Sequence, residues 1–191
     1  LAIQAGVKMR KALKELNDEL VGEGKLAMEI GIGINTGDCI VGNMGSDKRF
    51  DYTVLGDVVN LAARLEGQSG SYGVNIVLGE ETAKQMPDYK LIELDLIAVK
   101  GKTEAVTIFG LLGGPEMQGE QDFQKLAESH EQMLMAYRSQ DFDKAEELCK
   151  VCRTIPGNPE VLYDLYDERI EDYKENPPGP DWDGVFVATS K

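Results

Sequence analysis

The chain has 191 residues, of which 42% are hydrophobic and 28% are charged, so it is large enough to fold around an ordinary core. Its 34 acidic residues outnumber its 20 basic residues, and the net charge of −14 argues against nucleic acid and against direct contact with an anionic membrane. Three cysteines are too few for a disulfide scaffold and predict a reducing, cytoplasmic location. The chain starts at Leu1 with no initiator Met or signal pattern, which predicts a piece of a longer protein.

The first elements are predicted from the spacing of apolar residues. Val7, Leu13 and Leu20 lie on one helical stripe and predict a helix that runs from Leu1 to about residue 20. Two strand-like runs follow, at 26–34 and 38–42, and the Asn-Thr-Gly at 35–37 between them predicts a β-hairpin. Residues 58–65, preceded by an acidic residue, predict a second helix.

The remaining elements before residue 113 are short. Residues 74–78 predict a strand, and 80–86 predict a helix that Pro87 stops. Two further strands are expected at 89–99 and 106–112. A chain that mixes hairpins with helices favours an α+β fold with a largely antiparallel sheet over a doubly wound parallel one.

The composition changes at Gly113-Gly114-Pro115, a cluster that breaks regular structure. Residues 1–113 carry 12 basic and 16 acidic side chains, whereas 114–191 carry 8 and 18, so we place a domain boundary here. Three amphipathic helices are expected in the acidic extension at 114–191, and its middle resembles one tetratricopeptide-type hairpin. One such repeat cannot form a solenoid, so we expect the extension to pack on the first domain or on a partner.

Several short motifs fail as functional sites. The glycines at 31, 33 and 37 are spaced wrongly for a dinucleotide fingerprint, and 22–25 lacks the upstream glycine of a phosphate-binding loop. Cys149-x-x-Cys152 has no second ligand pair, so it predicts buried thiols. His130 is the only histidine and lies in the extension, which excludes triad chemistry from the first domain.

Four stretches remain, and their order along the chain carries the strongest signal. They are Gly-Ile-Asn-Thr-Gly-Asp at 33–38, Gly-Asn-Met-Gly at 42–45, Asp-Tyr-Thr-Val-Leu-Gly-Asp-Val-Val-Asn-Leu-Ala-Ala-Arg-Leu at 51–65, and Val-Lys-Gly-Lys at 99–102. The series resembles the C-terminal part of the class III adenylate/guanylate cyclase catalytic domain, over residues 1 to about 112. The resemblance implies a ferredoxin-like, palm-type α+β fold that is incomplete at its N-terminus, with a mixed, largely antiparallel sheet, flanking helices and then the helical extension.

Asn60 and Arg64 are the expected catalytic residues. Four residues along a helix turn by about 40° in projection, so both side chains can reach one ligand. The resemblance implies that Asn60 orients the ribose and that Arg64, a permanently charged planar fork, stabilises the transition state. From spacing alone, Arg64 could equally be a surface cation near Glu66 and Asn60 an ordinary polar helix residue.

Substrate contacts are expected from three further residues. The resemblance implies that Thr53 selects the purine, with the backbone of Val54 beside it, and that Lys100 reaches the β and γ phosphates. Thr53 is the type found in adenylate-forming members, although a threonine here is also an ordinary strand residue. Gly31 stands where some members carry a phosphate-binding arginine, so that contact must be absent or supplied otherwise.

The resemblance implies an adenylate cyclase that converts ATP to 3′,5′-cyclic AMP and pyrophosphate in intracellular signalling. The site would form between two subunits of a homodimer and use two Mg²⁺ or Mn²⁺ ions. Their ligands are expected upstream of Leu1, with none among Asp38, Asp51 and Asp57, so the 191 residues alone are expected to be inactive.

Three alternatives stay open from the sequence. The parent could be a guanylate cyclase, or an inactive cyclase-like module that dimerises or senses nucleotides. The acidic extension could instead carry the function as a protein-binding module. Members of the family often follow sensor or membrane-spanning regions, so tethering of the parent through an upstream region is also open.

Overall fold

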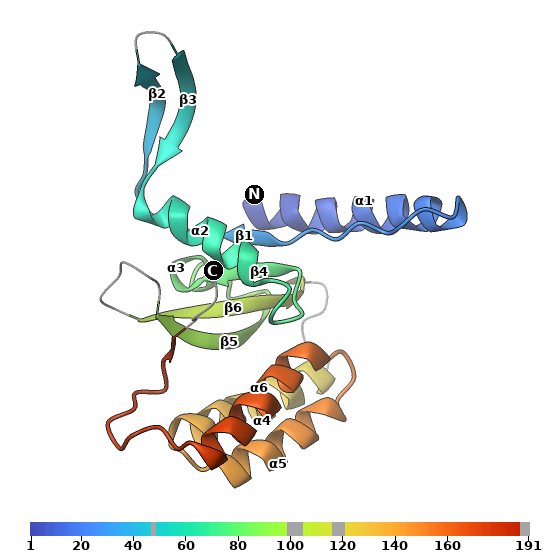
Figure 1. Ribbon diagram of the computed structural model, residues 1–191. Coiled ribbons are helices and arrows are strands. Elements are labelled where there is room, and N and C mark those ends of the chain that lie inside the picture. The colour runs from blue at the N-terminus through green and yellow to red at the C-terminus, as the bar shows by residue number, and fades with distance from the viewer. Residues whose placement is uncertain (47–48, 99–104, 116–120, 188–191) are drawn as a thin grey trace.

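The computed structural model describes residues 1–46, 49–98, 105–115 and 121–187. A helix, α1, opens the chain, and two sheets, two shorter helices and a three-helix extension follow (Figure 1). The helices are α1 (Ala2–Gly22), α2 (Asp57–Gln68), α3 (Glu80–Ala83), α4 (Gln121–Arg138), α5 (Phe142–Arg153) and α6 (Glu160–Glu175). The strands are β1 (Ile32–Ile34), β2 (Ile40–Ser46), β3 (Arg49–Leu55), β4 (Ile76–Gly79), β5 (Lys90–Ala98), β6 (Ala105–Gly113) and β7 (Phe186–Val187).

The main sheet is mixed and has the strand order β1-β4-β6-β5-β7. Its longest pairing, between β5 and β6, is antiparallel, as is that between β4 and β6, whereas β1 runs parallel to β4 and β7 parallel to β5. The α+β fold with a mixed sheet and flanking helices is therefore confirmed. The helices expected near 1–20, 58–65 and 80–86 and in the extension are also present, as are the strands expected near 74–78, 89–99 and 106–112.

The hairpin predicted between 26–34 and 38–42 is wrong. Only 32–34 of the first run forms a strand, and it pairs with β4, so that Ile32 faces Ile76 and Ile34 faces Leu78. The chain forms its hairpin one step later, between β2 and β3. The reason is that Asn35 and its neighbours do not close a turn, because they pack against the start of α2 instead, as described below.

The two faces of the sheet bury different side chains. On one face, Val77, Ile92 and Ile108 share a continuous core with α2 and with all three helices of the extension. On the other face, Ile76 and Leu78 pack with Ile3 of α1. The extension thus packs on the sheet of the first domain, which is one of the two placements that the sequence predicted.

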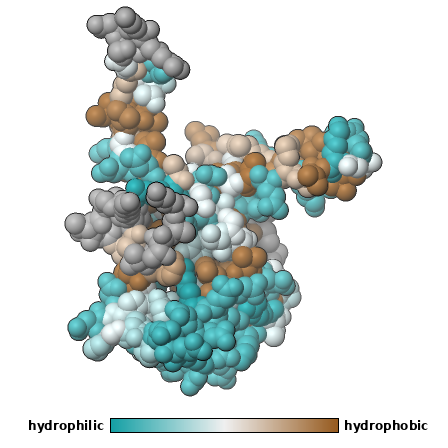
Figure 2. All heavy atoms as spheres, viewed as in Figure 1, coloured by the Kyte–Doolittle hydropathy of each residue, from teal (hydrophilic) through white to brown (hydrophobic). Residues whose placement is uncertain are grey.

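The β2–β3 hairpin projects from the rest of the molecule, and its base lies at the start of α2 (Figure 1). Figure 2 shows hydrophobic residues gathered on this hairpin and a mostly hydrophilic surface over the extension. Within the described ranges, none of the helices combines the length and the apolar character that a transmembrane segment requires.

Candidate active site

Helix α2 carries the predicted catalytic pair. Asp57 in its first turn suits the positive end of the helix dipole, and Leu61 and Leu65 bury one stripe of the helix against the sheet. Asn60 and Arg64 are both exposed and lie one turn apart. The local sequence therefore fixes the helix by its buried stripe and leaves these two side chains exposed.

Two glycines set how closely α2 approaches β1. A Cβ on Gly33 would lie 2.1 Å from the carbonyl oxygen of Ala62 and 2.4 Å from the backbone nitrogen of Glu66. A Cβ on Gly31 would lie 2.1 Å from Oγ of Ser69 and 2.9 Å from the carbonyl oxygen of Glu66. Any larger residue would push the helix away, so the absence of an arginine at 31 has a packing reason.

The Asn-Thr-Gly segment after β1 holds the first turn of α2. The side-chain amide of Asn35 donates to the carbonyl of Val58 over 3.1 Å, and a Cβ on Gly37 would lie 2.3 Å from Cγ1 of Val58. The hydroxyls of Thr36 and Thr82 hydrogen-bond over 2.8 Å, which ties the segment to α3. Sequence reasoning missed this anchoring role, although glycine alternating with isoleucine in a strand is a signal of close backbone approach.

The predicted purine contacts lie on the hairpin. Thr53 pairs with Gly42, and Val54 with Val41, and both Thr53 and Val54 are exposed. They occupy the end of β3 that leads into α2, so the structure brings them to the base of the hairpin from which the Asn60–Arg64 helix starts (Figure 1). Lys100 lies outside the described residues.

Three acidic residues lie near the site, each in a different part of the chain. Asp38 lines an open hollow of about 400 Å³ at the base of the hairpin, Asp51 lies on β3, and Asp57 begins α2. In the part of the chain that the structure describes, no group of three or more His, Cys, Asp or Glu side chains could hold a metal ion. The described residues therefore offer no fitted ligand set for the divalent ions that the resemblance implies.

The remaining polar candidates are buried in the extension. Cys149 and Cys152 are free, buried thiols, as predicted. Burial, reinforced by the nearby Asp167, raises the pKa of the Cys149 thiol to about 12, so this sulfur is inert at neutral pH. His130 is buried as well, which separates it from the exposed surface of α2.

Known proteins are similar to this chain over the same region. Residues 2–112 match the family model described as the adenylate and guanylate cyclase catalytic domain. An adenylate cyclase from Anabaena cylindrica is 38% identical over 116 residues, which are 56% of this chain and 23% of that protein. A terminal-differentiation-specific adenylate cyclase from Dictyostelium discoideum is 28% identical over 168 residues, 85% of this chain and 8% of that protein, so this likeness continues into the extension.

Two solved structures are also similar. The adenylyl cyclase CyaB from P. aeruginosa has 38% identity and a TM-score of 0.52, covering 59% of this chain and 57% of that one. The guanylyl cyclase Cya2 has 34% identity and a TM-score of 0.50, covering 62% and 59%. The chain thus spans less than a quarter of the two curated relatives. Because the family model matches more than half of the residues, and the exposed α2 pair sits within the match, the chain belongs to the adenylate and guanylate cyclase catalytic domain family.

Proposed function

We propose that the protein to which this chain belongs is an adenylate cyclase that converts ATP to 3′,5′-cyclic AMP and pyrophosphate. The observation that carries the proposal is the exposed Asn60–Arg64 pair on α2, which starts at the base of the hairpin bearing Thr53. Asn60 orients the ribose, and the Thr53 hydroxyl with the Val54 backbone contacts the adenine edge. Lys100 contacts the β and γ phosphates.

The chemistry asks for positive charge at the α-phosphate. The ribose 3′ oxygen gives up its proton to water and bonds to the α-phosphorus, while the bond from that phosphorus to the bridging oxygen of pyrophosphate breaks. Negative charge gathers on the α-phosphoryl oxygens and on the departing group. The guanidinium of Arg64 can stabilise this charge with two parallel hydrogen bonds. Divalent ions would assist the same step, but none of the residues that the structure describes is assigned to hold them.

A homodimer is part of the proposal, and the hairpin supports it. Ile40, Val41, Tyr52 and Leu55 expose 69%, 55%, 76% and 54% of their surfaces on this two-stranded element. Two strands without a covering layer are marginally stable in water, and exposed apolar patches mark interaction surfaces. Ile40 and Leu55 lie on one face of the hairpin and Val41 and Tyr52 on the other, and a second copy of the chain seated on the hairpin would cover one of these faces and complete a site shared between subunits.

The test is Arg64→Ala in the full-length protein, with the rate of cyclic AMP formation as the measurement. We expect turnover to fall by roughly 10²–10³, the typical loss when one preorganised donor to a developing anion is removed. Glu66→Ala, which removes an exposed charge from the same helix, is the matched control and should stay close to the unchanged rate. Unchanged turnover in Arg64→Ala would remove this residue from its role.

A guanylate cyclase is the second candidate, because a guanylyl cyclase structure is among the similar proteins. The two candidates differ in the purine that Thr53 contacts. Turnover of ATP and GTP measured side by side on the full-length protein distinguishes them, and a preference for GTP would exclude the adenylate assignment.

A further inference from the structure

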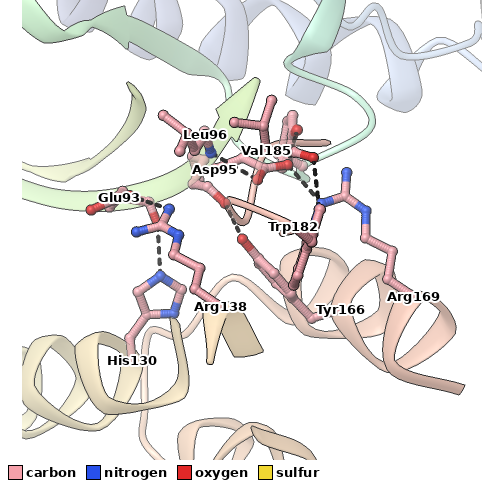
Figure 3. A network of polar contacts seen from close by, with 11 residues as sticks. Glu93, Asp95, Leu96, His130, Arg138, Tyr166, Arg169, Trp182 and Val185 are labelled. Carbon is pink, nitrogen blue, oxygen red and sulfur yellow. Dashed lines mark hydrogen bonds and ion pairs between the residues drawn. The ribbon is translucent and has the colours of Figure 1, made fainter. Parts of the chain in front are cut away.

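Side chains of the helical extension hydrogen-bond to backbone carbonyls of β5. The pairing of β5 with β6 shifts between Glu93 and Asp95, so that Leu94 is an extra residue in the strand. The Leu94 carbonyl accepts a hydrogen bond from the Tyr166 hydroxyl over 2.8 Å, and the Glu93 carbonyl lies 2.6 Å from Nε2 of His130 (Figure 3). Side chains of α4 and α6 thus bond the irregular part of the strand.

Asp95, the residue after this irregularity, joins three segments of the chain. Its carboxylate is 1% exposed, and one oxygen accepts hydrogen bonds from Arg169 on α6 over 2.6 Å and from the Tyr72 hydroxyl over 2.7 Å. The other oxygen accepts from the backbone of Leu96 over 2.8 Å. Burial, together with the Asp95 charge, raises the pKa of Tyr72, which keeps its hydroxyl protonated and donating.

Arg169 is itself fixed by its surroundings. It is 8% exposed, and its guanidinium carbon lies 3.4 Å from the centre of the Phe186 ring on β7. A buried ion pair adds little net stability compared with an apolar pair of similar size, but it fixes geometry when both charges are held from several sides. Arg169 and Asp95 therefore define where α6 sits against β5.

Tyr72 connects this network to the helix of the candidate site. It lies four residues after the end of α2, and its backbone nitrogen donates to the carbonyl of Gln68, the last residue of that helix. The same turn meets α6 a second time at Gly73, which has a φ of +64° and where a Cβ would lie 2.4 Å from Cβ of Val161. Both the first turn and the third turn of α6 therefore act on the segment that ends α2.

We propose that α6 is a positioning element for α2, acting through Arg169, Asp95 and Tyr72. The three are positioning residues, since none is placed at the substrate. The proposal rests on the proposed function in one respect, namely that α2 carries the Asn60–Arg64 pair. The extension then regulates the same site, because the contact of Arg169 with Asp95 sets how firmly Tyr72, and with it the end of α2, is held.

The first test is hydrogen exchange on the 191-residue chain with Tyr72→Phe, which removes one hydroxyl and keeps the ring. We expect the amides of α2 to exchange about tenfold faster relative to those of α5, because one hydrogen bond to a buried carboxylate is lost. Tyr163→Phe is the matched control, since it removes a buried tyrosine hydroxyl that bonds His130 inside the extension. It should leave the ratio of α2 to α5 exchange unchanged.

An unchanged ratio in Tyr72→Phe, or the same change in both variants, would overturn the proposal. The second test measures kcat and KM on the full-length protein, where Tyr72→Phe should lower kcat more than it changes KM, as expected for misplaced transition-state contacts. If Arg64→Ala lowers turnover while Tyr72→Phe leaves kcat unchanged, the positioning role fails and the proposed function stands. If exchange responds to Tyr72→Phe while Arg64→Ala has no effect, the coupling stands and the proposed function fails.

Discussion

At the scale of single residues, His130 shows how the extension uses a titratable group as a fixed structural part. Nε2 lies 2.6 Å from the Glu93 carbonyl and Nδ1 lies 3.2 Å from the Tyr163 hydroxyl. A carbonyl can only accept, so Nε2 donates to Glu93, and in the neutral ring Nδ1 then carries no hydrogen and accepts from Tyr163. This arrangement requires the neutral ring, and burial lowers the pKa of His130 to about 4.

The protonation of His130 predicts a loss of stability in acid. The unfolded chain takes up this proton near pH 6.5 and the folded chain only near pH 4, so in this window the unfolded state binds more protons. Lowering the pH through the window therefore favours unfolding, and the stability is fully present above pH 6.5. Between pH 7 and pH 4.5 we expect this residue to cost about 2 kcal/mol.

The measurement is urea unfolding at both pH values for the wild type and for His130→Gln. Glutamine can still donate to the Glu93 carbonyl but does not titrate, and His130 is the only histidine in the sequence. Carboxylates titrate in both proteins, so their contribution cancels in the difference. Equal losses of unfolding free energy in the two proteins would show that His130 is not protonated on unfolding.

At the scale of elements, the packing of α2 on β1 depends on the absence of a side chain. We expect Gly33→Ala to destabilise the protein by about 1–3 kcal/mol, because its Cβ would overlap backbone atoms of Ala62 and Glu66 that cannot rotate away. Gly67→Ala is the opposite case. Gly67 lies on α2 itself, and a Cβ added there would meet no atom within 4 Å beyond the backbone of its own helix. It should stabilise by about 0.5–1 kcal/mol through helix propensity. Thermal unfolding of both variants gives the two signs, and a neutral Gly33→Ala would contradict the close approach.

The packing of α2 on β1 also explains which elements could be predicted from the sequence. The helices could be predicted because the apolar spacing that forms each one lies within a single segment. The pair Asn60 and Arg64 could be predicted from α2 together with the resemblance. The partner of β1 is set by contacts far along the chain, since Asn35 bonds Val58 and Ile32 pairs with Ile76. A tight-turn signal at 35–37 could not reveal this, because glycine serves a turn and a close approach equally well.

The network around Asp95 was also invisible in the sequence. A tyrosine in a turn, an aspartate in a strand and an arginine in a helix each have an ordinary explanation when taken alone. Only the fold brings Tyr72, Asp95 and Arg169 together, although 74 residues separate the last two along the chain. Long-range polar networks of this kind depend on tertiary geometry rather than on local spacing.

At the scale of the whole molecule, the sheet and the extension share one core. Leu94 and Ile108 of the sheet and Tyr137, Leu162 and Tyr166 of the extension are nearly or completely buried in a single cluster. A boundary at Gly113 coincides with the end of β6, and the division into two domains there stays a prediction. Because they share this core, the sheet and the extension stabilise one another, whichever of them binds a partner or a ligand.

Removing residues 114–191 should therefore unfold the rest. The deletion would expose the sheet face formed by Val77, Ile92 and Ile108, and would leave the buried Asp95 without Arg169. We expect residues 1–113 to lose cooperative thermal unfolding and to bind more of a hydrophobic dye than the 191-residue chain, which unfolds in one transition. A cooperative transition at the same temperature in both would contradict the shared core. If deleting the extension abolishes cyclase activity, the loss therefore does not show whether the extension supports the fold or has a function of its own. Only variants that keep the core, such as Tyr72→Phe, can make that distinction.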